Sequence, residues 1–591
     1  MASSTQEYTA PLADMAFLMM HSHAGSLNDS QVKSDYFVLQ QAAKFAEEVL
    51  APVNRECDEQ GCQFANGKVR LPAAMKRAFK VYAEAGWMGV AMPEQWGGQA
   101  QTETLAANIG EMLTSSNHAF SMKPALTISA CRAIISHGTK QLQDTFLPNM
   151  IAGRWTGTMC MTEAHCGSDL GLIRTKAIAH QDGYLISGSK IFISSGEHDA
   201  SDNIIHLVLA RLPESPAGIK GLSLFLVPKQ LENERAQWVE NNHVTCIGIE
   251  EKMGIHSSPT CSLSFEKSKG YLVGDVNGGI QAMFTMMNEM RLGTCLQGVG
   301  LSERAYQKSL AYARARTQMR SLSGQKQPDQ EADYIVEHPD VRRMLLTQKA
   351  FADGGRALAQ FCAQLLDKTQ ISDDKDTQDL LDLLTPIAKG FCTESGLESA
   401  SLGVQVFGGL GFVRENGAEQ LYRNGRIGTL YEGTTGIQAL DLLGRKVLGN
   451  QGKSLKAMTK LIHVLSSENK EHAALSHLAQ QLSPYAKQWG ELSLKIGMRA
   501  MKNHDEVGAA SVDFLMYSGY VVLAYFHLKM AIEAQRLLDE NIECPELGIH
   551  TQFLQSKVQL AEFYFARILP RTKSLDVTML QELNSLYPVW R

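Results

Sequence analysis

Ile204-Ile-His-Leu-Val-Leu-Ala-Arg-Leu212 is a short apolar run bounded by Asp, Asn and Pro. Runs of this length, flanked by turn residues, are typical of buried strands. Residues 222–227 and 262–272 have the same character, and Asp182-Gly183 between residues 176–180 and 184–187 predicts a hairpin. Because no helical pattern separates these runs, the sequence predicts a β-sandwich or barrel rather than a βαβ sheet.

Helical periodicity surrounds this β region on both sides. Before it, one predicted helix ends ahead of Pro52, because proline disfavours helix in the preceding residue. After it, the apolar positions recur at i, i+3, i+4 and i+7. The supporting residues are Gln41, Ala42, Phe45, Ala46, Val49 and Leu50 before the β region, then Leu292, Cys295, Leu296 and Val299 after it. A polar stretch, 321–331, predicts an exposed loop, and a glycine-rich segment, 408–436, interrupts the later helices.

The predicted order of classes is therefore helical, β, helical, helical, an α+β multidomain fold. We expect an N-terminal helical domain over 1–155, a middle β-domain over 156–276, a helical bundle over 277–450 and a further helical domain over 451–591. For this last part, packing against the protein's own core is the favoured interpretation, since its apolar faces must be buried.

Composition narrows the functional classes. The 591 residues carry a net charge of −6, which argues against a nucleic-acid binder, because such a surface needs a basic excess. The sequence contains no apolar run of about 18 residues without charges, so no membrane span is predicted. The first 25 residues lack a signal-peptide pattern. Eleven scattered cysteines, without disulfide or zinc spacing, predict free thiols and a cytoplasmic protein.

Four segments carry polar chemistry. Residues 155–169 form a hydroxyl-rich turn that offers N–H groups to a phosphate or a heteroaromatic rim, or else make ordinary turn hydrogen bonds. In residues 188–196, Phe192 and Ser194 share one side of a strand and can flank a planar ligand; alternatively Phe192 is core. In residues 405–412, Gly408, Gly409 and Gly411 follow a helix, so they do not make the dinucleotide fingerprint.

The fourth segment, Leu430-Tyr-Glu-Gly-Thr-Thr-Gly-Ile-Gln438, places an acid among apolar and small residues. Burial would raise the pKa of Glu432 and suit it to act as a general base. The alternative is a carboxylate that caps the following helix. The sequence alone does not separate the two.

These four segments together, in this order over residues 35–450, resemble the flavin-dependent acyl-CoA dehydrogenase family. The segment Tyr8–Met15 and the additional C-terminal helices resemble its long bacterial subgroup, which includes 3-methylmercaptopropionyl-CoA dehydrogenase. The resemblance implies FAD, an acyl-CoA substrate, an electron-transfer flavoprotein as acceptor and a homodimer or larger homo-oligomer. It implies oxidation to a trans-2-enoyl-CoA, in fatty-acid β-oxidation or in 3-methylmercaptopropionyl-CoA catabolism.

The resemblance also implies residue roles. Glu432 matches the base that removes the α-proton, while flavin N5 accepts the β-hydride. Ser168, Asn288 and Arg291 match substrate-side positions. The positions that match flavin contacts are Met161, Thr162, Ser168, Phe192, Ser194, Arg316, Gln405, Gly408, Gly409 and Thr434. The chain departs from the family pattern at Ala164, where proline is common, and at Gln318-Met319.

Other interpretations remain open. An acyl-CoA oxidase would use O₂ instead of a carrier protein, and a non-catalytic acyl-CoA-binding homologue would keep the fold without the reaction. No metal site is expected, because Glu163, His165, Cys166 and Asp169 match no standard ligand set. The acyl chain is expected to be either a short thioether or a straight chain of medium to long length.

Overall fold

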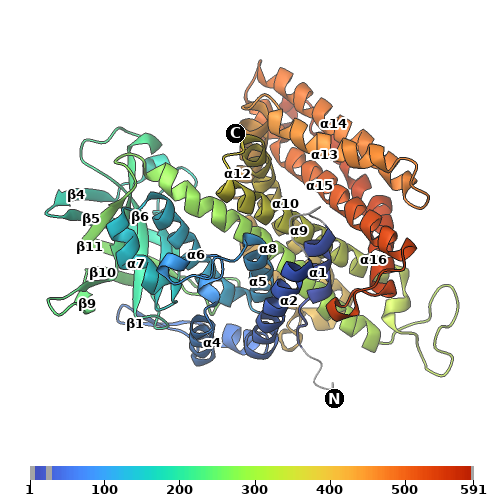
Figure 1. Cartoon of the computed structure of the whole chain (residues 1–591), viewed down its shortest axis with the longest axis horizontal. Helices are drawn as coiled ribbons and strands as arrows, with labels where there is room; N and C mark the ends of the chain where they lie inside the picture. The colour runs from blue at the N-terminus through green and yellow to red at the C-terminus, as the bar shows by residue number, and fades with distance from the viewer. Residues whose placement is uncertain (1–6, 22–28, 588–591) are drawn as a thin grey trace. The chain divides into compact units, whose positions relative to one another are not determined.

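The computed structural model describes residues 7–21 and 29–587, which divide into two compact units. Unit 1 comprises Met1–Glu47, Glu103–Ser115 and Thr294–Arg591. Unit 2 comprises Glu48–Thr102 and Ser116–Gly293. The long helix α8 (Gly279–Ala315) begins in unit 2 and ends in unit 1. Figure 1 labels the elements of both units.

Unit 2 combines short helices with the β region that the sequence predicts. Its helices are α3 (Asn54–Gln60), α4 (Ala73–Glu84), α6 (His118–His137) and α7 (Lys140–Ile151). Its strands are β1 (Gln63–Ala65), β2 (Lys68–Arg70), β3 (Trp155–Cys160), β4 (Lys176–His180), β5 (Gly183–Ser194), β6 (Asn203–Arg211), β7 (Leu222–Pro228), β8 (Gln230–Glu232), β9 (Trp238–Asn241), β10 (Val244–Ile249) and β11 (Thr260–Val273).

The main sheet closes on itself. Strands pair in the order β10-β11-β5-β4-β6-β3, and β7 pairs with both β11 and β6. The ring β4-β5-β11-β7-β6 is thus a barrel, although β4 and β6 meet only at Lys176 and Arg211. The hairpin predicted at Asp182-Gly183 is present, with His180 opposite Gly183.

Strand β6 is buried on both faces, which explains its unbroken apolar run. Ile205, Leu207 and Leu209 pack in the core beneath α6 and α7, while Val208 and Ala210 belong to a second core on the other face of the strand. Figure 1 shows α6 and α7 beside this sheet. An aromatic group completes the first core, with the Trp155 and Trp238 rings 4.9 Å apart.

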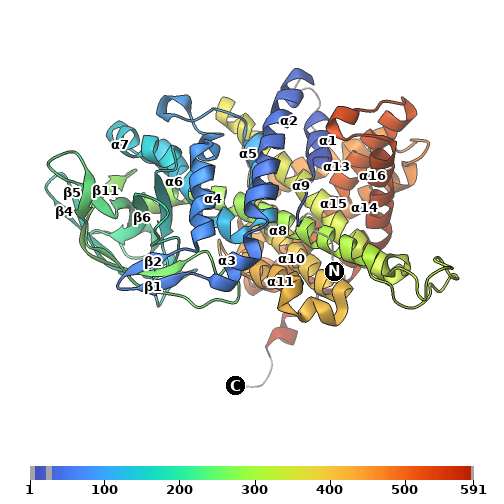
Figure 2. The same ribbon diagram turned by 90° about the horizontal axis from the view of Figure 1, so that it is seen from below.

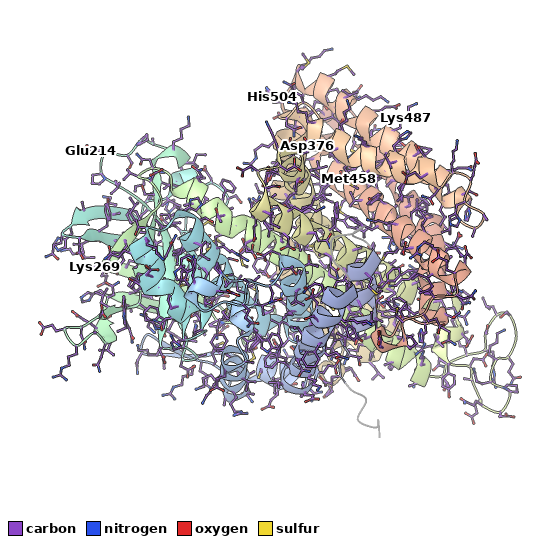
Figure 3. All side chains as sticks on the ribbon, viewed as in Figure 1. Glu214, Lys269, Asp376, Met458, Lys487 and His504 are labelled. Atoms are coloured by element: carbon purple, nitrogen blue, oxygen red, sulfur yellow. The ribbon has the colours of Figure 1, made fainter. Side chains whose placement is uncertain are left out.

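Unit 1 is helical. Its helices are α1 (Leu12–His21), α2 (Asp29–Lys44), α5 (Glu103–Ser116, of which the last residue falls in unit 2), α9 (Pro339–Ile371), α10 (Lys375–Phe407), α11 (Ala418–Gly425), α12 (Thr435–Leu440), α13 (Lys453–Glu468), α14 (Ser476–Ala500), α15 (Asp505–Asp539), α16 (Thr551–Phe563) and α17 (Thr572–Thr578). Figure 2 shows α14, α15 and α16 grouped together. Met458 on α13 is buried, whereas Lys487 on α14 is exposed (Figure 3).

The C-terminal helices are part of the core of unit 1. This confirms the interpretation that they pack against the protein's own core. Gly519 on α15 has no side chain, and the Phe391 ring of α10 lies 2.1 Å from the position that a Cβ would take. Helix α15 also contains one window of 18 residues that is apolar and long enough for a membrane span. Because 67% of that window is buried within the protein, α15 fits a core helix.

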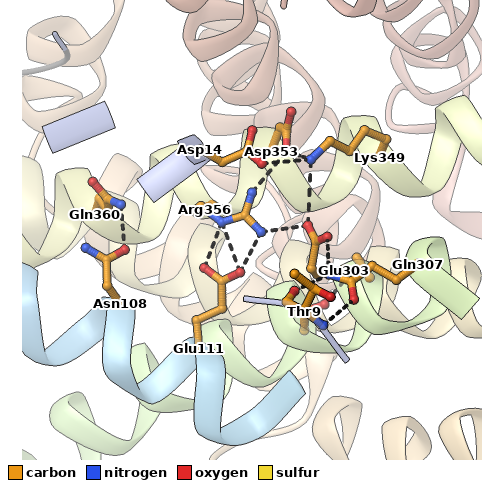
Figure 4. Close-up of polar contacts among 12 residues, drawn as sticks. Thr9, Asp14, Asn108, Glu111, Glu303, Gln307, Lys349, Asp353, Arg356 and Gln360 are labelled. Atoms are coloured by element: carbon orange, nitrogen blue, oxygen red, sulfur yellow. Dashed lines mark hydrogen bonds and ion pairs between the residues drawn. The ribbon is translucent and has the colours of Figure 1, made fainter. Parts of the chain in front are cut away.

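A buried ion cluster joins distant segments of unit 1 (Figure 4). The Arg356 guanidinium of α9 bonds Glu111 of α5 and Glu303 of α8, at N···O distances of 2.6 and 2.7 Å. Lys557 of α16 contacts Asp14 of α1 and, at 2.7 Å, Asp353 of α9. Helices α1 and α16 are therefore fixed to α9 by charge pairs that are mostly buried.

Candidate active site

The loop after β3 carries three predicted flavin-side residues. Met161 and Thr162 are half-buried, and Ser168 is exposed. The Ile191 amide donates to the Thr162 carbonyl over 2.9 Å, which brings this loop beside the end of β5. The loop and the strand that carry Thr162, Phe192 and Ser194 are therefore neighbours in unit 2.

Glu163 fixes the shape of that loop. Its carboxylate accepts from the Arg174 amide (2.8 Å), the Thr175 amide (3.0 Å) and the Thr175 hydroxyl (2.6 Å). The buried Lys190 ammonium donates to the same carboxylate and to the Met161 carbonyl, both over 2.9 Å. Burial alone would raise the pKa of Glu163, but Lys190 and these hydrogen bonds lower it to about 2.

Strand β5 is irregular where the predicted ligand-flanking residues lie. Its register against β11 shifts between Lys190 and Ile193, and Phe192 has a φ of +59°. The Phe192 side chain is 59% exposed, so the alternative of a core phenylalanine is wrong. Ser194 is half-buried. An exposed aromatic ring and a nearby hydroxyl can together line a planar group.

Three metal-ligand side chains do lie close together in the loop. Donor atoms of Glu163, His165 and Cys166 fall within 4.8 Å of one another. Both Glu163 oxygens already accept hydrogen bonds, however, and His165 Nε2 lies 2.8 Å from the Leu172 carbonyl. The interpretation as a polar turn, without a metal, stays our prediction.

Glu432 lies in unit 1 with a φ of +56°, followed by Gly433 at +84°. A non-glycine residue in this region costs about 1–2 kcal/mol and persists only where its neighbours hold it. Gln438 donates to the Glu432 carbonyl over 2.8 Å, and the buried Lys389 donates to the Gly433 carbonyl over 2.6 Å. The backbone at Glu432 is thus held from two sides.

The cap of the following helix is Thr434, not Glu432. The Thr434 hydroxyl accepts from the Ile437 amide at the start of α12, over 3.2 Å. The alternative of a capping carboxylate at Glu432 is therefore wrong. Thr435 donates instead to Glu394 over 2.6 Å, and Tyr431 donates to Gln297 of α8. Tyr431, Thr434 and Thr435 are thus each held by a side-chain hydrogen bond, and the cap of α12 is made without the Glu432 carboxylate.

The glycine-rich turn ends α10. Gly408 has a φ of +60°, and its amide donates to the Gln405 carbonyl. No atom of the described residues lies within 4 Å of a Cβ placed on Gly408 or Gly409. Position 408 needs glycine because of its positive φ angle, whereas Gly409 borders open space.

Arg316 lies near this turn. The Tyr312 ring of α8 stacks on the Phe407 ring of α10 at 4.1 Å, and the Arg316 amide donates to the Tyr312 carbonyl. Arg316 and Gln405 are both exposed. The structure therefore brings Arg316, Gln405, Gly408 and Gly409 to one end of α8 and α10.

Asn288 and Arg291 lie in the third and fourth turns of α8 rather than at its start, because the helix begins at Gly279. Arg291 is buried, with Nη1 3.4 Å from Asn288 Oδ1 and the guanidinium over the Phe284 ring. Asn288 is exposed. Both belong to unit 2.

Sequence reasoning missed the residues that hold these groups in place. Glu163 and Lys190 fix the flavin-side loop, and Lys389 and Gln438 fix the backbone of Glu432. A charged residue inside an apolar strand, as Lys190 is, was the available signal, since such a side chain is rarely buried without a partner.

Four family models match successive parts of the chain between residues 36 and 588. They are described as the acyl-CoA dehydrogenase N-terminal domain over residues 36–154, middle domain over 158–268 and C-terminal domain over 277–448, with an acetyl-CoA dehydrogenase C-terminal-like domain over 454–588.

Two curated relatives match nearly the whole chain. The 3-methylmercaptopropionyl-CoA dehydrogenase of Ruegeria pomeroyi is 37% identical over 95% of this chain and 96% of its own. A broad-specificity linear acyl-CoA dehydrogenase of Mycobacterium tuberculosis is 32% identical over 92% of each chain. A Bacillus anthracis acyl-CoA dehydrogenase complexed with FAD has a TM-score of 0.76 at 18% identity, covering 97% of this chain and 93% of its own, and shares the fold.

Proposed function

The chain belongs to the acyl-CoA dehydrogenase family, and we propose that it oxidises a saturated acyl-CoA to the trans-2-enoyl-CoA, with Glu432 as the base. The protein is an oxidoreductase of this family, with FAD as its cofactor. The held backbone of Glu432, with its φ of +56°, carries the assignment of the base.

The residues present fit a flavin. Phe192 offers an exposed ring, and Thr162 and Ser194 offer hydroxyls on the neighbouring loop and strand. Gly408 and Gly409 border open space where a backbone can approach a large ligand. Thr162, Ser194, Gly408 and Gly409 are therefore proposed to hold the FAD, with Met161, Ser168, Phe192, Arg316, Gln405 and Thr434. When bound, FAD accepts the hydride that leaves the β-carbon.

Residues of the chain itself account for the removal of the α-proton. Glu432 takes the α-proton on its carboxylate, and Lys389 and Gln438 hold the backbone so that this carboxylate keeps one direction. The amide of Glu432 is proposed to donate to the thioester carbonyl, where charge develops as the proton leaves. Ser168, Asn288 and Arg291 are proposed to contact the acyl-CoA.

The substrate class follows the relatives. A 3-methylmercaptopropionyl-CoA or a straight-chain acyl-CoA is proposed, since full-length relatives act on one or the other. We further propose an electron-transfer flavoprotein as acceptor, a homodimer and a cytoplasmic role in acyl-CoA catabolism. All eleven cysteines are free, as a reducing compartment requires.

Anaerobic titration of the purified yellow holoenzyme with saturated acyl-CoAs tests the reaction. The panel runs from butyryl-CoA to palmitoyl-CoA and includes 3-methylmercaptopropionyl-CoA. Bleaching of the flavin band by one class supports the proposal and names the substrate. Failure of every member to bleach the band would overturn the reaction. Rapid peroxide formation in air, without a carrier protein, would show that O₂ is the electron acceptor instead of an electron-transfer flavoprotein.

A further inference from the structure

Lys123 is a buried cation without a counter-ion. It lies on α6 and is 7% exposed. Its ammonium sits 5.0 Å from the centre of the Phe79 ring, and no carboxylate of the described residues forms an ion pair with it. Cys62 and Asp199 act on it only through their charge, and the Asp199 carboxylate accepts hydrogen bonds from the Leu71 amide and from Lys76. A buried ammonium without a partner is expensive in free energy.

A small cavity adjoins this side chain. Its volume is about 10 Å³, room for one water-sized particle. Lys123 lines it together with Ser195 and Ser257, which are 0% and 2% exposed. Neither serine hydroxyl has a hydrogen-bond partner among the residues that the structure describes. Three buried donors therefore border one enclosed space.

The electrostatic field in this space is positive. Ala119 and Phe120, in the first turn of α6, also line the cavity. A helix N-terminus carries a partial positive charge, which adds to the charge of Lys123. Burial lowers the pKa of Lys123 to about 8, so the ammonium remains the main form at neutral pH, and the field persists there.

We propose that the space between Lys123, Ser195 and Ser257 binds a single monovalent inorganic anion of the halide class. One ammonium and two hydroxyls supply donors and no carboxylate competes, which suits an anion. The small volume favours a monatomic anion over phosphate, sulfate or a carboxylic acid. The apolar lining from Met75 and Phe79 favours a weakly hydrated ion of single charge, because desolvation of a divalent ion would cost far more.

The ion would fasten the end of β5. Ser195 follows Ser194 directly and has a φ of +54°, a conformation that its surroundings must hold. Its amide is already bonded to the Pro259 carbonyl over 2.8 Å, and Ser257 and Ser258 lie on the same loop as Pro259. A bound anion would join that loop to α6 through Lys123. The site does not depend on the proposed reaction.

Bromide is the probe, because it scatters anomalously and reports on halide sites. Crystals of the holoenzyme grown in bromide are expected to show an anomalous peak within hydrogen-bonding distance of Lys123 Nζ. In solution, the unfolding temperature is expected to rise saturably with bromide, compared with gluconate at the same ionic strength. Chloride should compete with bromide in this titration.

Variants separate a specific site from general salt effects. Ser257→Ala is expected to keep the fold and to weaken bromide binding at least about tenfold, since a hydrogen bond to a charged group is lost. Lys123→Met should abolish the bromide response, and Lys176→Met, at an exposed lysine of β4, should leave it unchanged. The absence of an anomalous peak would overturn the proposal. So would an equal rise of the unfolding temperature with bromide in the wild type and in Ser257→Ala. Either result would mean that the cavity holds only water. Ser257→Ala decides the question even if Lys123→Met fails to fold.

Discussion

Lys190 Nζ lies 2.9 Å from Glu163 Oε1, and neither side chain is more than 6% exposed. The pair joins β5 to the loop after β3, the two segments that carry the predicted flavin contacts of unit 2. Since the two charges neutralise each other away from solvent, removal of one leaves the other buried and uncompensated.

Glu163→Gln is expected to lower the free energy of unfolding of unit 2 by about 3–5 kcal/mol, because the Lys190 ammonium loses its counter-charge. Urea denaturation measures the change. Glu214→Gln, at an exposed loop residue (Figure 3), is the matched control and should be neutral. The double variant Glu163→Gln/Lys190→Met should lose less than the two single variants together. Strict additivity would contradict a direct coupling.

Acid should release the same contact. The folded pKa of Glu163 is about 2, below the unfolded value of 4.5, so its stabilisation is complete above pH 4.5. It should fall as the pH drops from 4.5 through 2, by up to about 3 kcal/mol. The difference in unfolding free energy between the wild type and Glu163→Gln, measured at several pH values, should shrink across this window. A constant difference would mean that Glu163 is not ionised in the folded protein.

Glu432→Gln should keep the flavin and lose turnover. A general base contributes about 10²–10⁴-fold, so kcat is expected to fall at least that far while the flavin absorbance stays. The measurement is anaerobic flavin bleaching by the best acyl-CoA. Glu415→Gln, at an exposed residue of the same unit, should bleach normally. Normal bleaching by the Glu432 variant would remove this residue from the reaction.

Lys557→Met should loosen the ion cluster of unit 1. Asp14 and Asp353 lose one of their cations and keep Lys349, so a loss of about 3 kcal/mol in unfolding free energy is expected. Lys573→Met, at an exposed lysine nearby in sequence, is the control. Amide hydrogen exchange should show faster exchange in α1 as well as α16. Confinement of the effect to α16 would mean that α1 is held by other contacts.

Two glycines of the turn after α10 should respond differently. Gly408→Ala is expected to cost about 1 kcal/mol of stability, because its φ of +60° disfavours a Cβ. Gly409→Ala should leave the stability of the apoprotein unchanged, since no atom of the residues that the structure describes lies within 4 Å of the added methyl. It should nevertheless weaken FAD retention or dimer formation, measured by flavin content and sedimentation. Full retention of both would place the cofactor and the partner elsewhere.

Local patterns predicted the class of each part of the chain. The apolar runs of β6 and β7 indicated strands because both strands are buried on both faces. Helix α10 spans Lys375–Phe407, because Asp374 caps its start and the helix continues through Pro386. A proline signal alone could not show this, because packing decides whether the helix continues past it.

The site could be predicted only as a set of matching positions. Nothing local in the sequence shows that Phe192 and Glu432 adopt positive φ. Asp14 and Lys557 are 543 positions apart, and no periodicity connects them. Such pairs depend on tertiary packing, which a single sequence does not encode in any readable spacing.

That separation has a consequence for biosynthesis. Asp14 leaves the ribosome 543 residues before Lys557. Unit 2 is complete once Gly293 has emerged and can fold while synthesis continues. Asp14 can pair with Lys349 once α9 has emerged, but its contact with Lys557 must wait for α16. Nascent chains stalled before α16 are therefore expected to leave this contact of α1 unmade and α1 more open to chaperones and proteases, although helices α1 to α15 have been made.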